Sequence, residues 1–210
     1  MADLRESHRF ASKGVITMVG KPTLLKLVFF KTTDADWKKL YQPLIDGGND
    51  LLKPHNMKLS FPAGDPIGIP HQGPINSRAG EPGAVRYKCH QALPVGVGIP
   101  IIFGVMEDDN IFGETFKTGN VNANGDVGWP PYCILSTKIL NRTRTTLVHE
   151  LIHTTLPYRE GVDEHDHTDV SDVFNPAGAG SDKKDGQTIK KVLPKRWAEN
   201  LRRAYFAYPG

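Results

Sequence analysis

The sequence predicts an α/β or α+β domain in which one mixed, twisted sheet packs against a few helices. Segments rich in β-branched and aromatic residues alternate with segments of helical periodicity, which is typical of this class. The chain contains 21 glycines and 16 prolines, and this abundance favours long loops over a helix bundle. Its 210 residues are enough for one domain with a substantial apolar core.

The first predicted elements are a buried strand, a helix and a second strand. Residues 23–31 are rich in β-forming side chains and predict the buried strand. Helical spacing of apolar residues follows over about 36–54, with Asp34 or Asp36 as the expected N-cap. Residues 57–61 then alternate between apolar and polar, as in a half-buried strand. This half of the chain therefore predicts a strand, a backing helix and a strand.

The middle of the chain predicts short strands separated by two long loops. The loops cover 62–84 and 107–131, where glycine, proline, aspartate and asparagine gather. The predicted strands are 85–89, 99–106 and 132–136. Since proline lacks a backbone N–H, Pro100 indicates that the second of these strands lies at a sheet edge or that Pro100 lies near its start.

Two helices complete the expected order. The first runs from Asn141 or Thr143 to Thr155 and ends before Pro157, and the last covers about 195–207. We expect residues 1–22 to be an N-terminal arm. Residues 23–210 are then a single domain, with an upper part over about 23–156 and a lower part over about 157–210.

Charge and hydropathy exclude several classes of protein. The formal net charge is +3, and the basic residues near the C-terminus are interpreted as a solvated helix face, so the sequence does not point to nucleic acid as a partner. No apolar run is long enough to cross a membrane. The N-terminus has no ordinary secretory signal, which predicts a cytoplasmic protein or one exported by a non-classical route. Whether Cys89 and Cys133 form a disulfide is left open.

The most informative segment reads Leu-Val-His-Glu-Leu-Ile-His over residues 147–153. On a helix that advances about 100° per residue, its four aliphatic side chains form one face. His149 and His153 fall on the opposite side, one turn apart, and Glu150 lies on a neighbouring line. This is the H-E-x-x-H pattern, in which the imidazoles bind one zinc ion and the carboxylate acts as general base toward zinc-activated water.

Through this motif the sequence resembles the zincin metallopeptidases, and among them the metzincins. The resemblance covers about 23–207, and its specific part is 147–178. It implies a sheet with a backing helix, an active-site helix and a C-terminal helix. It also implies a turn beneath the metal, for which residues 172–178 are the candidate, with Phe174 where the family has methionine. The family's edge strand binds extended peptides, a role that the resemblance offers for 101–106.

The third metal ligand is less clear from the sequence. The family's usual spacing would put glycine at Leu156 and histidine or aspartate at Arg159, and neither is present. The resemblance to reprolysins and matrixins favours His165, whereas a resemblance to a bacterial enterotoxin branch favours His167. Other zinc hydrolases suggest further ligands, namely Glu199 in gluzincins and Asp163 or Asp169 in aspzincins. Peptide deformylases take a cysteine ligand from an upstream motif that the residues around Cys133 do not match, so Cys133 is interpreted as a buried strand residue.

Two additional sites are weaker predictions. Tyr158 follows the motif helix and is a candidate oxyanion or substrate contact, although a packing role is the simpler interpretation. The acidic and amide side chains of 107–126 offer oxygen ligands for Ca²⁺, but their spacing fits turns better than a calcium loop.

The sequence therefore predicts a zinc metalloendopeptidase that cleaves peptide or protein substrates. In this interpretation His149, His153 and His165 bind one Zn²⁺ and Glu150 is the general base. A bacterial secreted effector or toxin is compatible with the small size and the missing signal. The alternative hypothesis is a zinc-containing binding module of the same fold that does not hydrolyse peptides. Oligomeric state and cleavage specificity are not encoded in any pattern that we find.

Overall fold

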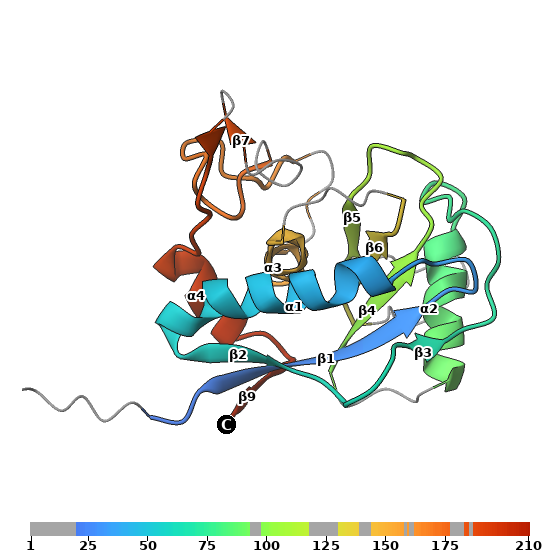
Figure 1. Ribbon diagram of the computed structural model, residues 1–210, viewed down its shortest axis with the longest axis horizontal. Coiled ribbons are helices and arrows are strands. Elements are labelled where there is room, and N and C mark those ends of the chain that lie inside the picture. The colour runs from blue at the N-terminus through green and yellow to red at the C-terminus, as the bar shows by residue number, and fades with distance from the viewer. Residues whose placement is uncertain are drawn as a thin grey trace, which may run out of the picture.

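A computed structural model describes residues 20–92, 98–117, 130–138, 144–157, 159, 162–176, 183–184 and 187–210. The elements lie in the order seen in Figure 1. The strands are β1 (Thr23–Lys31), β2 (Met57–Ser60), β3 (Ile67–Gly68), β4 (Ile99–Gly104), β5 (Gly113–Phe116), β6 (Tyr132–Ser136), β7 (Lys183–Lys184), β8 (Gln187–Thr188) and β9 (Ala207–Pro209). The α-helices are α1 (Lys38–Leu52), α2 (Glu81–Ala92), α3 (Thr146–His153) and α4 (Lys195–Arg202).

One mixed sheet organises the described part of the chain. Its main path is β2-β1-β4-β6-β5, and β3 and β9 add to the two sides of β1. The strands β2, β1, β4 and β6 are parallel, whereas β5 runs antiparallel to β6 at the end of the path. The separate pair β7–β8 lies above α4 in Figure 1. The structure thus confirms the expected mixed sheet with a backing helix, an active-site helix and a C-terminal helix.

The two faces of the sheet carry two separate apolar cores. Alternate residues of β1 illustrate the division, because Leu27 and Phe29 pack toward α1, α3 and α4, whereas Val28 and Phe30 pack toward α2. The helices α1 and α3 therefore cover one face and α2 covers the other (Figure 1). The larger core includes the aliphatic residues of α3, so the motif helix packs against the larger of the two apolar clusters.

Two glycines in α1 allow this helix to approach its neighbours. A Cβ atom on Gly47 would lie 2.3 Å from the carbonyl oxygen of Arg144, and one on Gly48 would lie 2.9 Å from Cδ1 of Leu59. Any side chain at Gly47 would collide with backbone just before α3. The Gly-Gly pair therefore fixes the distance between α1 and the start of the motif helix.

Several local predictions were wrong. Residues 85–89 lie in helix α2 and not in a strand, because burial recurs at Pro82, Val85, Arg86 and Cys89 with helical spacing. The long loops 62–84 and 107–131 contain the short strands β3 and β5, and α2 begins inside the first of them.

The expected N-cap of α1 was also wrong. Trp37 is the N-cap and makes no side-chain cap, while Asp34 accepts a hydrogen bond from the backbone N–H of Gly73 (2.7 Å). The helix starts two residues later than its predicted boundary and ends at Leu52, where a 3₁₀ turn (Lys53–His55) follows. The Asp34 carboxylate therefore binds the loop that contains Gly73 and does not cap the helix. Such a long-range contact cannot be predicted from the local sequence pattern.

The position of β4 settles the role of Pro100. This strand lies between β1 and β6 and is not an edge, so the suggestion that 101–106 binds peptide at a sheet edge was wrong. Pro100 is the second residue of β4, which confirms the alternative of a strand start. The edge beside the motif helix is β5 instead.

Cys89 and Cys133 are both buried and free, so they do not form the disulfide that the sequence left open. None of the described helices combines the length and the apolar character that a bilayer crossing requires. The proposed boundaries of the arm and of the upper and lower parts remain predictions.

Candidate metal centre

The motif helix α3 is buried on every side. Its four aliphatic residues, Leu147, Val148, Leu151 and Ile152, are fully buried against the larger core. His149 and Glu150 on its other side are also only 3% and 5% exposed. They are covered because β5 lies against one flank of the helix and the 162–176 segment against another. The helical pattern of the sequence thus sets the direction of each side chain, and distant segments enclose them.

Three histidines converge beside α3. The Nε2 atom of His165 lies 3.2 Å from Nε2 of His149 and 3.1 Å from Nε2 of His153. One ligand atom from each of the three rings lies within 4.8 Å of the others, an arrangement that can hold a metal ion. His165 thus completes the cluster from a loop twelve residues beyond His153.

Each of the three rings is oriented by an acceptor on its other nitrogen. Nδ1 of His149 lies 2.9 Å from the carbonyl oxygen of Val173, Nδ1 of His153 lies 3.3 Å from a Glu164 carboxylate oxygen, and Nδ1 of His165 lies 2.7 Å from an Asp163 carboxylate oxygen. These partners can only accept, so each Nδ1 carries the proton. Each Nε2 then presents a lone pair toward the common centre.

Burial favours the neutral form of His149 and His153. It lowers the pKa of His149 and of His153, and for His153 the neighbouring rings of His149 and His165 add to the effect. Neutral imidazole is the form that binds a metal. The Asp163 pKa is lowered because its carboxylate accepts hydrogen bonds from the backbone N–H and ring of His165 and from His167.

The geometry of the cluster fits a tetrahedral ion. The lone pair on Nε2 of His165 faces those of His149 and His153 at 3.2 and 3.1 Å, and a cation between them would relieve their repulsion. Zinc–nitrogen bonds of about 2.0–2.1 Å in a tetrahedron place the nitrogens about 3.3–3.4 Å apart, close to these two separations. The donor set of three imidazoles also matches catalytic zinc sites that leave one position open.

Phe174 forms the base of the cluster. Its fully buried ring lies 5.2, 4.7 and 5.2 Å from the ring centres of His149, His153 and His165. The turn that carries it is fastened by Asp172, which accepts hydrogen bonds from the backbone of Phe174 and from Arg196 and Trp197 on α4. The C-terminal helix therefore supports the cluster from below.

Glu150 is held by the edge strand. The hydroxyl of Thr115 donates to a Glu150 carboxylate oxygen at 2.7 Å. A Cβ atom on Gly113 would lie 2.9 Å from the other carboxylate oxygen, so only glycine leaves room for Glu150 at this point of β5. Two alternate residues of β5 thus define the position of this carboxylate.

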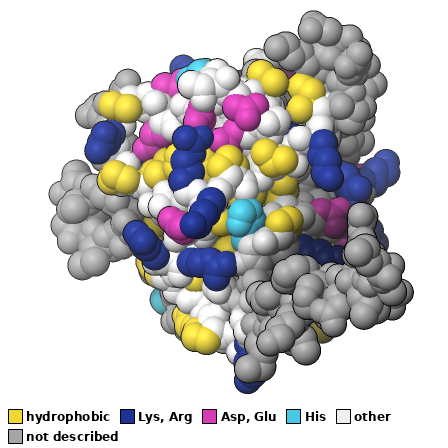
Figure 2. Space-filling model, turned by 90° about the vertical axis from the view of Figure 1, so that its left-hand side faces the viewer, with side chains coloured by type: hydrophobic (Ala, Val, Ile, Leu, Met, Phe, Trp, Pro, Cys, Tyr) yellow, Lys and Arg dark blue, Asp and Glu magenta, His cyan; other side chains and the backbone are white. Residues whose placement is uncertain are grey.

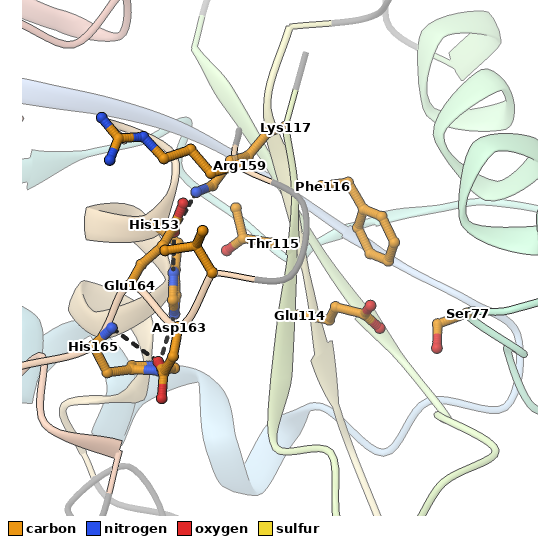
Figure 3. A pocket seen from close by; sticks show the side chains of 11 residues that line it. Ser77, Glu114, Thr115, Phe116, Lys117, His153, Arg159, Asp163, Glu164 and His165 are labelled. Carbon is orange, nitrogen blue, oxygen red and sulfur yellow. Dashed lines mark hydrogen bonds and ion pairs between the residues drawn. The ribbon is translucent and has the colours of Figure 1, made fainter. Parts of the chain in front are cut away.

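A cavity of about 540 Å³ opens beside the histidines. Residues of β5 form one wall, Arg159 and residues 162–165 form another, and His153 and His165 contribute their rings (Figure 3). Lys117, the residue after β5, forms an ion pair with Glu164, the same carboxylate that contacts His153. This chain of contacts connects the edge strand to the loop that carries His165.

The other predicted residues lie apart from the cluster. His167 contacts Asp163 and is 60% exposed in its side chain, so the structure brings His165 and not His167 to the metal centre. Glu199 forms a surface pair with Lys195 on α4, Asp169 accepts a hydrogen bond from the backbone of Ser171, and Cys133 is buried in β6 opposite Thr115. Tyr158 lies outside the described residues, as do the suggested Ca²⁺ ligands Asn122, Asn124 and Asp126. Among the described candidates for Ca²⁺, Asp108 accepts a hydrogen bond from the backbone of Asn110 and Asp109 pairs with Lys138, which agrees with turn chemistry.

The basic residues of α4 have structural partners. Arg196 pairs with Asp166 and Asp172, and Arg202 donates to the backbone carbonyl of His55. On the face of the molecule shown in Figure 2, basic side chains are interspersed with acidic and apolar ones. This distribution agrees with the interpretation of a solvated surface.

Sequence reasoning missed three contributors. Gly113 and Thr115 belong to a strand that was predicted as loop, and Lys117 ends the same segment. A weak signal was present, since Thr115 and Phe116 are residue types that favour strands. Asp163 was considered as a ligand, whereas in the structure it supports the ring of His165.

Comparison with known proteins adds information about the fold. No protein-family profile matches the sequence, and no curated protein matches it. The fold is similar to the crystal structure of metalloproteinase-II from Bacteroides fragilis, with a TM-score of 0.52 and 15% sequence identity over 88% of this chain. The match covers 54% of that protein, so this chain spans about half of its length. The fold of this chain is therefore similar to that of a metalloproteinase, and its three clustered histidines can hold a metal ion.

Proposed function

We propose that this chain is a zinc-dependent metalloendopeptidase of the zincin type, similar to the metzincins. The observation that supports it most strongly is the convergence of three Nε2 lone pairs on one point, with Glu150 on the same helix as two of them. A structural site would be served by the ligands alone. The additional buried carboxylate, held by Thr115, is the group that hydrolysis requires.

His149, His153 and His165 would hold the zinc ion, and Phe174 takes the place of the family's methionine beneath it. When bound, zinc supplies Lewis-acid chemistry, which polarises a peptide carbonyl and makes hydroxide available at neutral pH. Glu150 accepts a proton from the attacking water and returns it to the leaving amine. Thr115 and Gly113 keep the carboxylate in position for both transfers.

The substrate would be a peptide in extended conformation. β5 is the end strand of the described sheet path and borders the cavity beside the histidines. An extended peptide can add to such an edge by main-chain hydrogen bonds. The metalloproteinase fold of the structural neighbour supports the same substrate class.

The proposal is tested with a peptide library on the zinc-loaded wild type and on Glu150→Gln, with Glu199→Gln as the matched control on α4. We expect Glu150→Gln to keep its zinc and to lose cleavage by about 10²–10⁴-fold, which is the usual contribution of a general base. Glu199→Gln should cleave like wild type. Zinc binding without cleavage by the wild type would favour the alternative of a non-hydrolytic binding module.

A further inference from the structure

The cavity beside the histidines reaches both faces of β5. Thr115 and Lys117 extend from one face toward α3 and Glu164, whereas Glu114 and Phe116 extend from the other (Figure 3). All four side chains line the cavity. A peptide added to this edge would place alternate side chains on the two faces. One set of substrate side chains would therefore meet Glu114 and Phe116.

The acidic side chains of the cavity differ in whether they already have partners. Asp163 and Glu164, the other acidic residues of the cavity, already contact His165, His167, His153 and Lys117. Glu114 receives a hydrogen bond from Ser77, but its Oε2 atom is buried and has no hydrogen-bond donor among the described residues. Arg159 points away from Glu114 in Figure 3. Among the carboxylates of this cavity, Glu114 is therefore the one with a buried acceptor atom that has no donor among the described residues.

We propose that the Glu114 face of β5 binds a basic side chain of the peptide substrate, lysine or arginine. The Glu114 carboxylate, which lines the cavity, would accept from the ammonium or guanidinium group, and a turn of its side chain would bring the buried Oε2 to the ligand. The methylene stem of the same side chain would pack on Phe116, whose ring is fixed by stacking on Tyr132 at 5.0 Å. This inference rests on the proposed peptidase function, because it takes the ligand to be a peptide along β5.

The electrostatics of Glu114 agree with a cationic ligand. Burial raises the pKa of Glu114, and the nearby Glu150 adds to this effect. The negative charge of the ionised carboxylate is therefore poorly stabilised in the free protein. A cation bound to this carboxylate would stabilise its negative charge. Neutral side chains of similar length would gain only the contact with Phe116.

The test uses the zinc-loaded Glu150→Gln protein, which should bind peptides without cleaving them. The probes are blocked alanine-serine octapeptides that carry one lysine at successive positions, with norleucine replacing lysine in a matched set. We expect lysine to bind about tenfold more tightly than norleucine at one position. Adding Glu114→Gln should abolish the difference, and adding Glu114→Lys should transfer the preference to peptides with glutamate. The added control Glu199→Gln should retain the lysine preference.

A second arm separates this inference from the proposed function. Cleavage sites of the wild type in a peptide library should show lysine or arginine enriched at one subsite, and Glu114→Gln should lose that enrichment. Cleavage without a basic preference, or a preference that persists in Glu114→Gln, overturns the inference and leaves the peptidase proposal intact. A Glu114-dependent lysine preference in binding, without cleavage by the wild type, supports the inference and contradicts the peptidase proposal.

Discussion

The sheet with its helices and the segment after α3 hold the candidate site by different means. In the first region, His149, Glu150 and His153 are placed by a helix whose four aliphatic residues are fully buried in the larger core. In the second region, His165 and Phe174 lie in a segment of turns, where aspartates accept hydrogen bonds from nearby backbone and side-chain groups. Apolar burial directs the first half of the site, whereas in the second half it reaches only Val173 and Phe174, and polar contacts direct His165.

This difference determines how much each half depends on metal. Buried aliphatic contacts persist whether or not an ion is present, because they rest on the exclusion of water. The loop of His165 has no such core. Between Val162 and Val170 the described side chains are at least partly exposed, and its ring faces two other lone pairs. A metal ion would thus stabilise the second region far more than the first.

The largest expected effect is therefore a local loss of order when the metal is removed. Chelation of the zinc-loaded protein should accelerate amide exchange in 162–176 by about a hundredfold or more, with changes within about twofold in β1, β4 and β6. Hydrogen exchange followed by mass spectrometry measures both regions in one experiment. Equal acceleration across the sheet and the 162–176 segment would contradict the proposed division.

A smaller effect is expected where β5 meets Glu150. Thr115→Val keeps the shape of the side chain and removes the hydroxyl that donates to the carboxylate. The turnover number kcat should fall about tenfold with little change in KM, since Glu150 would be less well oriented for proton transfer. Steady-state kinetics on a peptide that the wild type cleaves measures this.

Thr115→Ser is the matched variant, because it restores the hydroxyl and should recover most of kcat. Zinc content and amide exchange in 162–176 should stay as in wild type for both variants. A Val variant with normal kcat would show that Thr115 serves only packing, and a loss of zinc would show that the two regions are coupled through β5.

The smallest effect is expected for the replacement of Phe174 by methionine. Replacing it by methionine, the residue that the family uses in this turn, nearly conserves volume and should lower the free energy of unfolding by less than about 1.5 kcal/mol, with zinc retained. Phe174→Ala should lower it by about 3–5 kcal/mol because the fully buried ring leaves a cavity. Urea unfolding of the zinc-loaded proteins gives both values. A Met variant as unstable as the Ala variant would mean that the aromatic ring has a specific role.

The sequence predicted those features that depend on local periodicity. The motif helix, the strands over 23–31 and 132–136, and the central part of α1 follow directly from apolar spacing. The convergence of His149 and His153 also follows, since residues four apart share a helix face. The prediction failed at α2, where Val85, Tyr87 and Cys89 alternate like a strand although the buried face has helical spacing.

The remaining features depend on contacts between distant residues. β5 is a short strand of partly exposed residues, so its pairing with β6 and its contact with Glu150 leave little trace in its own sequence. The choice between His165 and His167 depends on how Asp163 is shared between the two rings. Such contacts become visible only when the folded chain brings α3, β5 and the 162–176 segment together.

The central claim is that His149, His153 and His165 hold one zinc ion, and zinc content measures it most directly. Proteins purified without added metal and analysed by mass spectrometry should contain about one zinc per chain in the wild type and in His167→Ala, and far less in His165→Ala. The ring of His167 contacts Asp163 and lies outside the cluster, which is the reason for the expected difference. Zinc well below one per chain in the wild type, or equal loss in the two variants, would contradict the assignment.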